Sequence, residues 1–204
     1  MKIIAIDFDG VIADSDAAKV AFARDELGLD VSERFMKERY FSELFGEGRG
    51  RSLYAHILEN VYRTERMLEA PMMPHSREGI SQLRAGGWSC AVVTSRSGRL
   101  DDSGSYAFWA WRYLQENGYE IEEKDFLTVN GGSKLDVCLA LGAHGLVDDD
   151  YAKIEPVIAA GLKGYLFSTQ TNSAVEEEVP AFQGIRVEDW NHLVGILLSL
   201  SERA

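Results

Sequence analysis

Residues 1–15 read Met1-Lys-Ile-Ile-Ala-Ile-Asp-Phe-Asp-Gly-Val-Ile-Ala-Asp-Ser15, a short apolar run followed by two acidic residues and a glycine. The run from Lys2 to Ile6 is rich in β-branched residues and predicts a buried strand. Asp7 and Asp9 follow it at alternate positions, just before Gly10. Negative charge at the end of a buried strand is costly unless a cation is bound there or a reaction requires it. The stretch therefore predicts a site at the carboxyl edge of a sheet, where ligands bind in open α/β proteins.

The composition narrows the class of protein. The 204 residues suffice for one domain with an insertion, and the hydrophobic share of 46% is ordinary for a globular protein. The 21 basic and 33 acidic residues give a formal charge of −12, which argues against nucleic acid as a general partner. No run approaches the ~18 apolar residues of a membrane span, and the apolar run after Lys2 is too short for a signal peptide. We expect a cytoplasmic protein without membrane contact; the sequence indicates no particular oligomeric state.

Strand-like and helix-like segments alternate through the second half of the chain. The strand patterns lie at Trp88–Thr94, Phe126–Val129, Gly145–Val147 and Gly164–Phe167. Segments of helical periodicity separate them. Such alternation predicts an α/β fold, with a Rossmann-like parallel sheet and helices on both faces.

One long stretch interrupts this alternation. Between Ile12 and Trp88 there is no strand pattern, and the periodicity is helical up to about residue 70. An insertion of this kind predicts a separate helical unit. We therefore expect a catalytic core of residues 1–14 and 72–204, with a small all-helical cap of residues 15–71 inserted after the first strand.

Polar residues lie at or just after the ends of the predicted strands. They are Asp7 with Asp9, Thr94 with Ser95, Lys134 at the start of a helix, and Asp148 with Asp149. Because parallel strands end at one edge of a sheet, we expect these side chains to meet in one pocket. Carboxylates are the ligands that Mg²⁺ prefers, and lysine and hydroxyl donors suit the oxygens of a phosphate.

This order of motifs resembles the haloacid dehalogenase (HAD) superfamily of phosphohydrolases. Asp7-Phe-Asp-Gly-Val11 is similar to the first motif of that family, Thr94 to the second, Lys134 to the third and Asp148-Asp149 to the fourth. The resemblance covers residues 1–15 and 72–167. It implies an Mg²⁺-dependent phosphomonoesterase that forms an aspartyl-phosphate and acts on a small phosphorylated substrate. Within the family, the second aspartate favours phosphoryl transfer over carbon–halogen cleavage.

The resemblance also implies catalytic roles. Asp7 would be the nucleophile that attacks phosphorus. Asp9 would protonate the leaving oxygen and then deprotonate the attacking water. Thr94 and the Ser95 amide would hold the transferring phosphoryl group. Lys134 would neutralise charge on Asp7 and the phosphate.

The metal site implied by the resemblance consists of four aspartates. Asp7 and the backbone carbonyl of Asp9 would bind Mg²⁺, together with Asp149. Asp148 would act through a metal-bound water, and which residue of the Asp148–Asp149 pair touches the metal stays open. The physical need does not depend on the family, because a carboxylate attacks a phosphate dianion only if positive charge screens their repulsion.

The expected cap contains the features that would select the substrate. We expect helices at Ser32–Phe45 and Arg51–Glu69, separated by a loop at Gly46-Glu-Gly-Arg-Gly50. Arg49 and Arg51 would either reach an anion from this loop or face solvent. Arg96 and Arg99, just beyond the second motif, are further candidates for substrate contact.

Several substrates remain open. The stretch from Asp7 to Asp14 looks like the opening of 5′(3′)-deoxyribonucleotidases, which makes a (deoxy)nucleotide one expected substrate. The loop from Thr94 to Gly98 is also similar to polynucleotide 3′-phosphatase domains. The motifs are compatible as well with a sugar-phosphate phosphatase, a phosphomutase or a non-catalytic HAD-fold binding protein. A non-catalytic relative would be expected to lack Asp7, Asp9 or Lys134, and all three are present.

Overall fold

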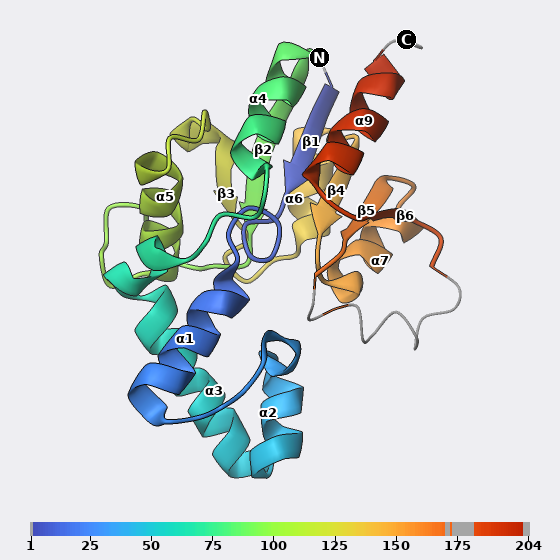
Figure 1. Cartoon of the computed structure of the whole chain (residues 1–204). Coiled ribbons are helices and arrows are strands. Elements are labelled where there is room, and N and C mark those ends of the chain that lie inside the picture. The colour runs from blue at the N-terminus through green and yellow to red at the C-terminus, as the bar shows by residue number, and fades with distance from the viewer. Residues whose placement is uncertain (1, 170–171, 173–181, 202–204) are drawn as a thin grey trace.

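The computed structural model describes residues 2–169, 172 and 182–201. Within them, six strands form one parallel sheet in the order β3-β2-β1-β4-β5-β6 (Figure 1). The strands are β1 (Lys2–Ile6), β2 (Trp88–Thr94), β3 (Phe126–Thr128), β4 (Gly145–Asp148), β5 (Lys163–Phe167) and β6 (Ile185–Val187). This arrangement confirms the predicted α/β fold with a Rossmann-like sheet.

The first strand lies at the centre of the sheet. Ile4 of β1 is in register with Cys90 of β2 on one side and with Gly145 of β4 on the other. Successive residues of a strand point to opposite faces. Ile4 and Ile6 accordingly belong to one apolar core, whereas Ala5 belongs to a second core on the opposite face.

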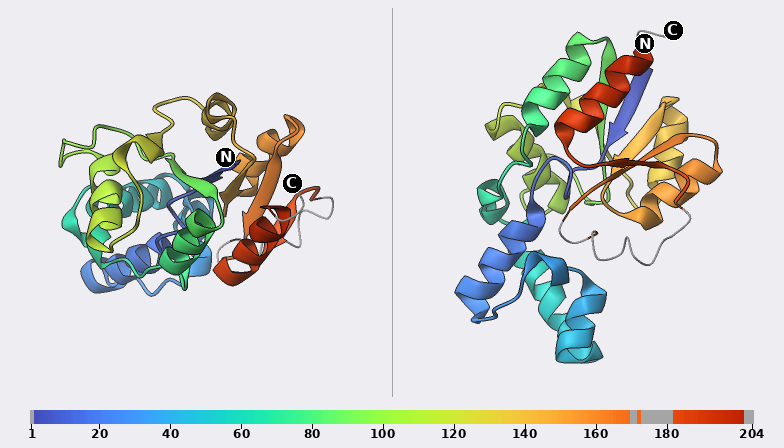
Figure 2. Two further views of the ribbon diagram at one scale, coloured as in Figure 1. Left: turned by 90° about the horizontal axis from the view of Figure 1, so that it is seen from above. Right: turned by 45° about the vertical axis from the view of Figure 1, so that its right-hand side comes forward.

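Helices cover both faces of the sheet (Figure 2). The first core is closed by α4 (Ser76–Ala85), α5 (Tyr106–Glu116) and α9 (Trp190–Ser201). The second core is closed by α6 (Lys134–Leu141) and α7 (Tyr151–Ala159). Because both faces are covered, the carboxyl ends of the central strands remain as the place where polar side chains can gather.

The chain between β1 and β2 is helical, and we call residues 15–71 the helical segment. Its elements are α1 (Ser15–Leu27), η1 (Glu33–Phe35), α2 (Glu38–Phe45), α3 (Glu47–Tyr62) and η2 (Glu65–Glu69). The three α-helices lie beyond the carboxyl ends of the strands (Figure 1). They have an apolar cluster of their own, built on Phe22, Ala23, Met36, Phe41, Ile57 and Val61.

The predicted loop at Gly46–Gly50 is wrong. Gly46 alone separates α2 from α3, and its φ of 82° lets the chain reverse in one residue. Gly50 lies inside α3, where a β-carbon would be 2.2 Å from the carbonyl oxygen of Phe41. This glycine therefore serves the close packing of α2 on α3. The predicted helix Arg51–Glu69 is also divided, because α3 ends at Tyr62 and η2 follows.

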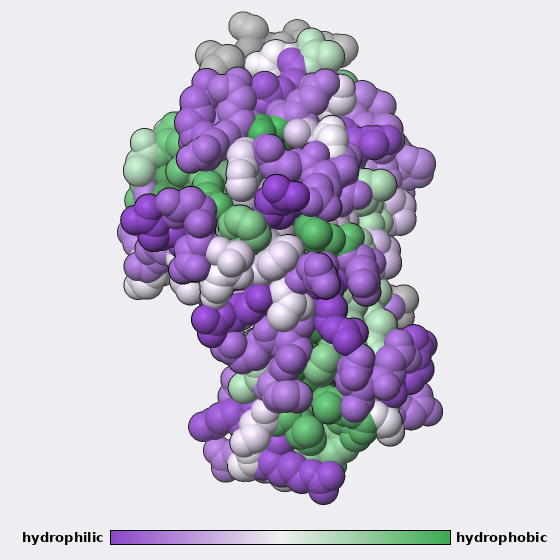
Figure 3. All heavy atoms as spheres, turned by 90° about the vertical axis from the view of Figure 1, so that its left-hand side faces the viewer, coloured by the Kyte–Doolittle hydropathy of each residue, from purple (hydrophilic) through white to green (hydrophobic). Residues whose placement is uncertain are grey.

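In the view of Figure 3 the surface is mostly hydrophilic, with smaller hydrophobic patches. No helix in the described part of the chain has the length and apolar character needed to cross a membrane.

Candidate active site

A cavity of about 360 Å³ lies where the sheet edge faces the helical segment. The sheet edge contributes Asp7, Asp9, Ser95, Lys134, Asp148 and Asp149 to its wall. The helical segment contributes residues that include Asp16, Lys19, Met36, Lys37, Tyr54 and Tyr62. The predicted convergence of the strand-end residues is therefore present in the structure.

The ammonium group of Lys134 lies between two carboxylates. Its Nζ is 2.7 Å from Asp7 Oδ1 and 2.7 Å from Asp148 Oδ2. A Ser133–Asp136 capping box begins α6 at this point and so fixes where the lysine leaves the backbone. All three charged side chains are buried. Two carboxylates against one ammonium leave a surplus of negative charge in the site.

Gly10 brings the first and fourth motifs together. Its φ of +73° is in the left-handed region, and a β-carbon there would lie 2.8 Å from Asp149 Cγ. Only glycine therefore lets the backbone after Asp9 approach the Asp149 side chain so closely. On the neighbouring residue, Asp148 Oδ1 accepts a hydrogen bond of 2.9 Å from the Asp150 N–H.

Three carboxylates provide a donor set for a divalent cation. One oxygen from each of Asp7, Asp148 and Asp149 lies within 4.8 Å of the others. Burial raises the pKa of Asp7 well above its usual range, because its acidic neighbours add to burial and together outweigh Lys134. Burial and nearby Asp148 also raise the pKa of Asp149 to about 7, despite Lys37. A cation would relieve this repulsion, so these residues fit a hard divalent ion such as Mg²⁺.

Arg96 holds Asp9 in its ionised form. Its Nε and Nη2 donate to the two Asp9 carboxylate oxygens at 3.0 and 2.8 Å. The buried guanidinium also lies 3.7 Å from the centroid of the Tyr62 ring. Burial disfavours charge on Asp9, but Arg96, Ser15 and Lys19 outweigh it and lower the pKa to about 2. Of the two arginines predicted after Thr94, Arg96 therefore binds the second aspartate of the first motif.

The two hydroxyl residues at the end of β2 differ in their surroundings. Thr94 is fully buried, and its Oγ1 accepts a 3.1 Å hydrogen bond from the Arg96 N–H. Ser95 is exposed and lines the cavity. Ser95 is therefore the residue of this pair that faces the cavity.

Three predicted arginines lie outside the cavity wall. Arg99 is 79% exposed and pairs with Asp101 at 2.7 Å. Arg51 pairs with Glu38 at 3.0 Å on the helix surface. The Arg49 guanidinium lies 6.0 Å from the centroid of the Phe45 ring. Arg49 and Arg51 lie away from the cavity because Gly46–Gly50 does not form a loop that could reach toward the sheet.

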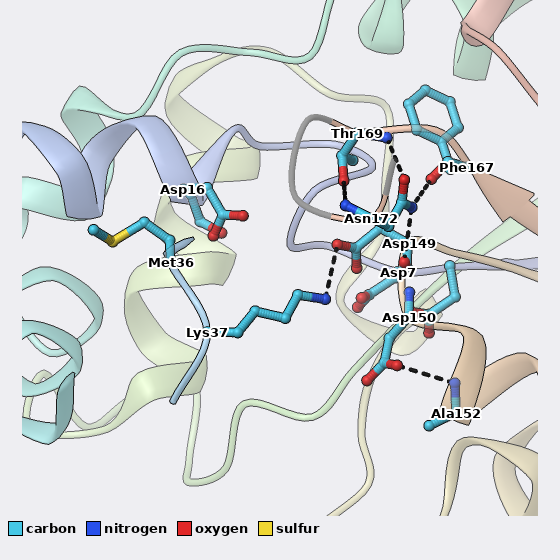
Figure 4. Close-up of polar contacts among 12 residues, drawn as sticks. Asp7, Asp16, Met36, Lys37, Asp149, Asp150, Ala152, Phe167, Thr169 and Asn172 are labelled. Atoms are coloured by element: carbon cyan, nitrogen blue, oxygen red, sulfur yellow. Dashed lines mark hydrogen bonds and ion pairs between the residues drawn. The ribbon is translucent and has the colours of Figure 1, made fainter. Parts of the chain in front are cut away.

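The sequence did not indicate Lys19 and Lys37, two cationic residues of the cavity wall. Lys19 is buried, forms an ion pair with Asp16 and donates to the Met36 carbonyl at 3.3 Å. Lys37 extends from the helical segment toward Asp149, with Nζ 3.8 Å from Oδ2 (Figure 4). Neither lysine belongs to a motif, and only the fold brings this part of the chain to the sheet edge.

Asn172 forms a hydrogen bond to the backbone of the fourth motif (Figure 4). Its Nδ2 donates to the carbonyl of Asp149 at 2.9 Å and to the carbonyl of Phe167 at 2.6 Å. Its Oδ1 accepts from the Thr169 N–H at 2.9 Å. The side chain thus joins the loop after β4 to the end of β5. The sequence offered no signal for this role.

Solved structures of other proteins share this fold. A HAD-family hydrolase from Deinococcus radiodurans R1, with bound phosphate and sodium, matches with a TM-score of 0.68 and 14% identity, covering 98% of this chain and 96% of that one. The HAD-like fold of this chain is therefore established. A HAD-superfamily hydrolase of subfamily IA from Geobacter sulfurreducens also matches this fold, with a TM-score of 0.59 and 19% identity, covering 97% of this chain and 96% of that one.

A third solved structure that matches this chain is a D,D-heptose 1,7-bisphosphate phosphatase from B. bronchiseptica, in complex with magnesium and phosphate. It matches with a TM-score of 0.55 and 16% identity, over 98% of this chain and 99% of that one. Comparison of the sequence with protein-family models and with curated proteins gives no match.

Proposed function

We propose that this protein is an Mg²⁺-dependent phosphomonoesterase that acts on a small phosphorylated metabolite through an aspartyl-phosphate. The observation that carries the proposal is the Lys134 ammonium, 2.7 Å from both Asp7 Oδ1 and Asp148 Oδ2. An ammonium at this place screens the repulsion between the Asp7 carboxylate and an incoming phosphate dianion. The nearby acidic cluster supports a role for a divalent cation.

Asp7 is the proposed nucleophile. Its Oδ1 accepts hydrogen bonds from the Phe8 N–H at 2.7 Å and from Lys134, so we assign the attack to Oδ2. A bond forms between this oxygen and phosphorus while the ester P–O bond breaks. When bound by Asp7, Asp148 and Asp149, Mg²⁺ would supply positive charge that favours the ionised nucleophile and the charged phosphoryl oxygens.

Asp9 is the proposed acid and base. Beside Arg96 the Asp9 carboxylate is ionised. In this form it acts as the base that takes a proton from the water that hydrolyses the aspartyl-phosphate. To protonate the leaving oxygen in the first step, the carboxyl must leave Arg96 and take up a proton. The Arg96 contact would thus separate two states of this residue.

The helical segment, residues 15–71, is the proposed cap, and residues 1–14 and 72–204 are the proposed core. The cavity has walls from both, so movement of the cap would exclude water from the reaction and select small substrates. Ser95 and the backbone after Thr94 are the proposed contacts of the phosphoryl group. The cytoplasmic location stays a prediction.

The direct test is hydrolysis of p-nitrophenyl phosphate with and without Mg²⁺. We expect activity only with the metal, and a loss of at least about a thousandfold in Asp7→Asn. Asp101→Asn is the matched control, because Asp101 is 69% exposed and pairs only with the surface residue Arg99 among described residues. Wild-type protein as inert as Asp7→Asn across a broad panel of phosphate esters would refute the proposal.

The same panel addresses the substrate. We propose a (deoxy)nucleotide as one substrate on the strength of the resemblance at Asp7–Asp14, so dUMP, dTMP and 3′-nucleotides belong in the panel. Sugar phosphates are the comparison set. Activity confined to sugar phosphates contradicts the nucleotidase proposal while leaving the phosphatase proposal intact, and accumulation of a bisphosphate with little free phosphate indicates a mutase.

A further inference from the structure

Lys37 brings positive charge into the cavity from a firmly held backbone. The residue before it, Met36, is fully buried in the apolar cluster of the helical segment. The Met36 carbonyl accepts hydrogen bonds from Lys19 Nζ at 3.3 Å and from the Tyr54 hydroxyl at 3.2 Å. With the chain fixed at this position, the Lys37 side chain crosses toward the sheet edge (Figure 4).

The contact that Lys37 makes with the sheet edge is loose. Its Nζ is 3.8 Å from Asp149 Oδ2, whereas a charge-assisted hydrogen bond spans about 2.7–2.9 Å. The Lys37 side chain also keeps 35% of its surface exposed. An ammonium held at this distance can exchange Asp149 for an anionic ligand without the loss of a formed hydrogen bond.

Lys153 faces the same cavity from the core. It lies in the first turn of α7, is exposed, and lines the cavity. Within the described part of the chain it takes part in no ion pair. Lys37 and Lys153 therefore approach one space from the helical segment and from the core.

The other cations of the cavity are already engaged. Lys134 is bound to Asp7 and Asp148, and Lys19 is bound to Asp16. Arg96, next to the cavity, is bound to Asp9 through two hydrogen bonds. The positive charge available for a ligand thus comes from Lys37 and Lys153.

We propose that Lys37 and Lys153 form a second anion-binding subsite, and that the substrate is a phosphomonoester that carries another anionic group, a carboxylate or a second phosphate. The inference rests on the proposed function, since it assumes that the reacting phosphoryl group lies over Asp7. The second group would then draw the helical segment and the core together from the two sides of the cavity.

Binding to the full-length Asp7→Asn chain tests the subsite, because the nucleophile is absent and the ligand persists. Calorimetry with Mg²⁺ would compare 3-phosphoglycerate with glycerol 3-phosphate, which differ in a carboxylate, and fructose 1,6-bisphosphate with fructose 6-phosphate, which differ in a phosphate. We expect the more anionic member of at least one pair to bind about tenfold more tightly or better. The pair that shows the preference identifies the second group.

Variants in the Asp7→Asn background assign the preference to residues. We expect Lys37→Met and Lys153→Met each to reduce it severalfold, and Lys37→Arg to retain most of it. Lys124→Met is the control, since Lys124 is 71% exposed and pairs with Glu122 on the surface. Equal affinities within both pairs, no binding of any ligand, or a preference unchanged in Lys37→Met would overturn the subsite. If the wild-type protein hydrolyses phosphate esters but the two ligands of each pair bind equally well, only the subsite is rejected. If the wild-type protein is inert in the hydrolysis assay, the proposed phosphatase function itself is rejected.

Discussion

Arg96 is the residue that most changes the interpretation of the first motif. Its guanidinium is buried between the Tyr62 ring, 3.7 Å from the centroid, and the Phe8 ring, 4.9 Å from the centroid. In this position it makes two hydrogen bonds to the Asp9 carboxylate. Burying a guanidinium is costly unless an anion accompanies it. Asp9 therefore has a structural role as the anionic partner of Arg96, in addition to the catalytic role that we propose.

Removing the guanidinium should destabilise the protein through Asp9. We expect Arg96→Met to lower the free energy of unfolding by about 2–4 kcal/mol, because the Asp9 carboxylate, 26% exposed, loses its partner. Adding Asp9→Asn should recover part of this loss, which a double-mutant cycle in urea measures. Arg99→Met breaks an exposed pair and should cost no more than about 0.5 kcal/mol. Additive effects of Arg96→Met and Asp9→Asn would show that the pair is not coupled.

Individual residues show which contacts of the site could be predicted from the sequence and which could not. The convergence of Asp7, Lys134 and Asp149 follows from parallel strands that end at one edge, so spacing alone predicted it. The partner of Arg96 could not be predicted in this way. Its position after Thr94 placed it near the site, but whether it meets a substrate or Asp9 depends on the space left by the Tyr62 ring, which comes from another element.

The loops after β4 and β5 are held together by one side chain. Asn172 connects them by donating to the carbonyls of Asp149 and Phe167. The side chain is buried, and its amide oxygen also accepts from Thr169. The backbone of Asp149 is thus held by a residue that does not itself line the cavity.

Removing this brace should weaken the proposed metal site. We expect Asn172→Ala to lower the affinity for Mg²⁺ by about tenfold, the size of effect seen when residues that orient metal ligands are lost. Asn117→Ala is the matched control, because Asn117 also donates its amide to a backbone carbonyl, at 3.0 Å, but at the end of α5. Calorimetric titration measures both. Equal Mg²⁺ affinities in Asn172→Ala and wild type would contradict a positioning role for Asn172.

The elements themselves were largely predictable, and each exception has a physical cause. Apolar runs and helical periodicity predicted the strands and most helices, because burial imposes those patterns. Gly50 misled the prediction, since glycine in a polar stretch indicates a loop as readily as a close helix contact. Lys37 and Asn172 were missed because no motif marks either residue and each contacts Asp149, a residue remote in the sequence.

At the scale of the whole molecule, the helical segment and the sheet enclose a site whose acidity exceeds its positive charge. Burial, with Asp148 and Asp16 nearby, raises the pKa of Asp149 to about 7, from a usual value of 3.8, despite Lys37 and Lys134. Between these two values the folded protein holds a proton that the unfolded chain has lost. The contribution of this group to the stability of the metal-free protein is therefore present at low pH and is lost as the pH rises through about 7.

A bound divalent cation should reverse this dependence. The ion needs Asp149 ionised, so below about pH 7 it must displace a proton before it binds. We therefore expect Mg²⁺ to raise the melting temperature more at about pH 8 than at about pH 6, relative to protein in EDTA. In Asp149→Asn the increase should be smaller and should depend less on pH, because only the raised pKa of Asp7 then opposes binding of the ion, whereas Asp101→Asn, on the exposed surface, should behave as wild type. An equal increase at both pH values in wild type would mean that Asp149 does not take part in binding the ion, and the metal would then have to be held by Asp7 and Asp148 without it.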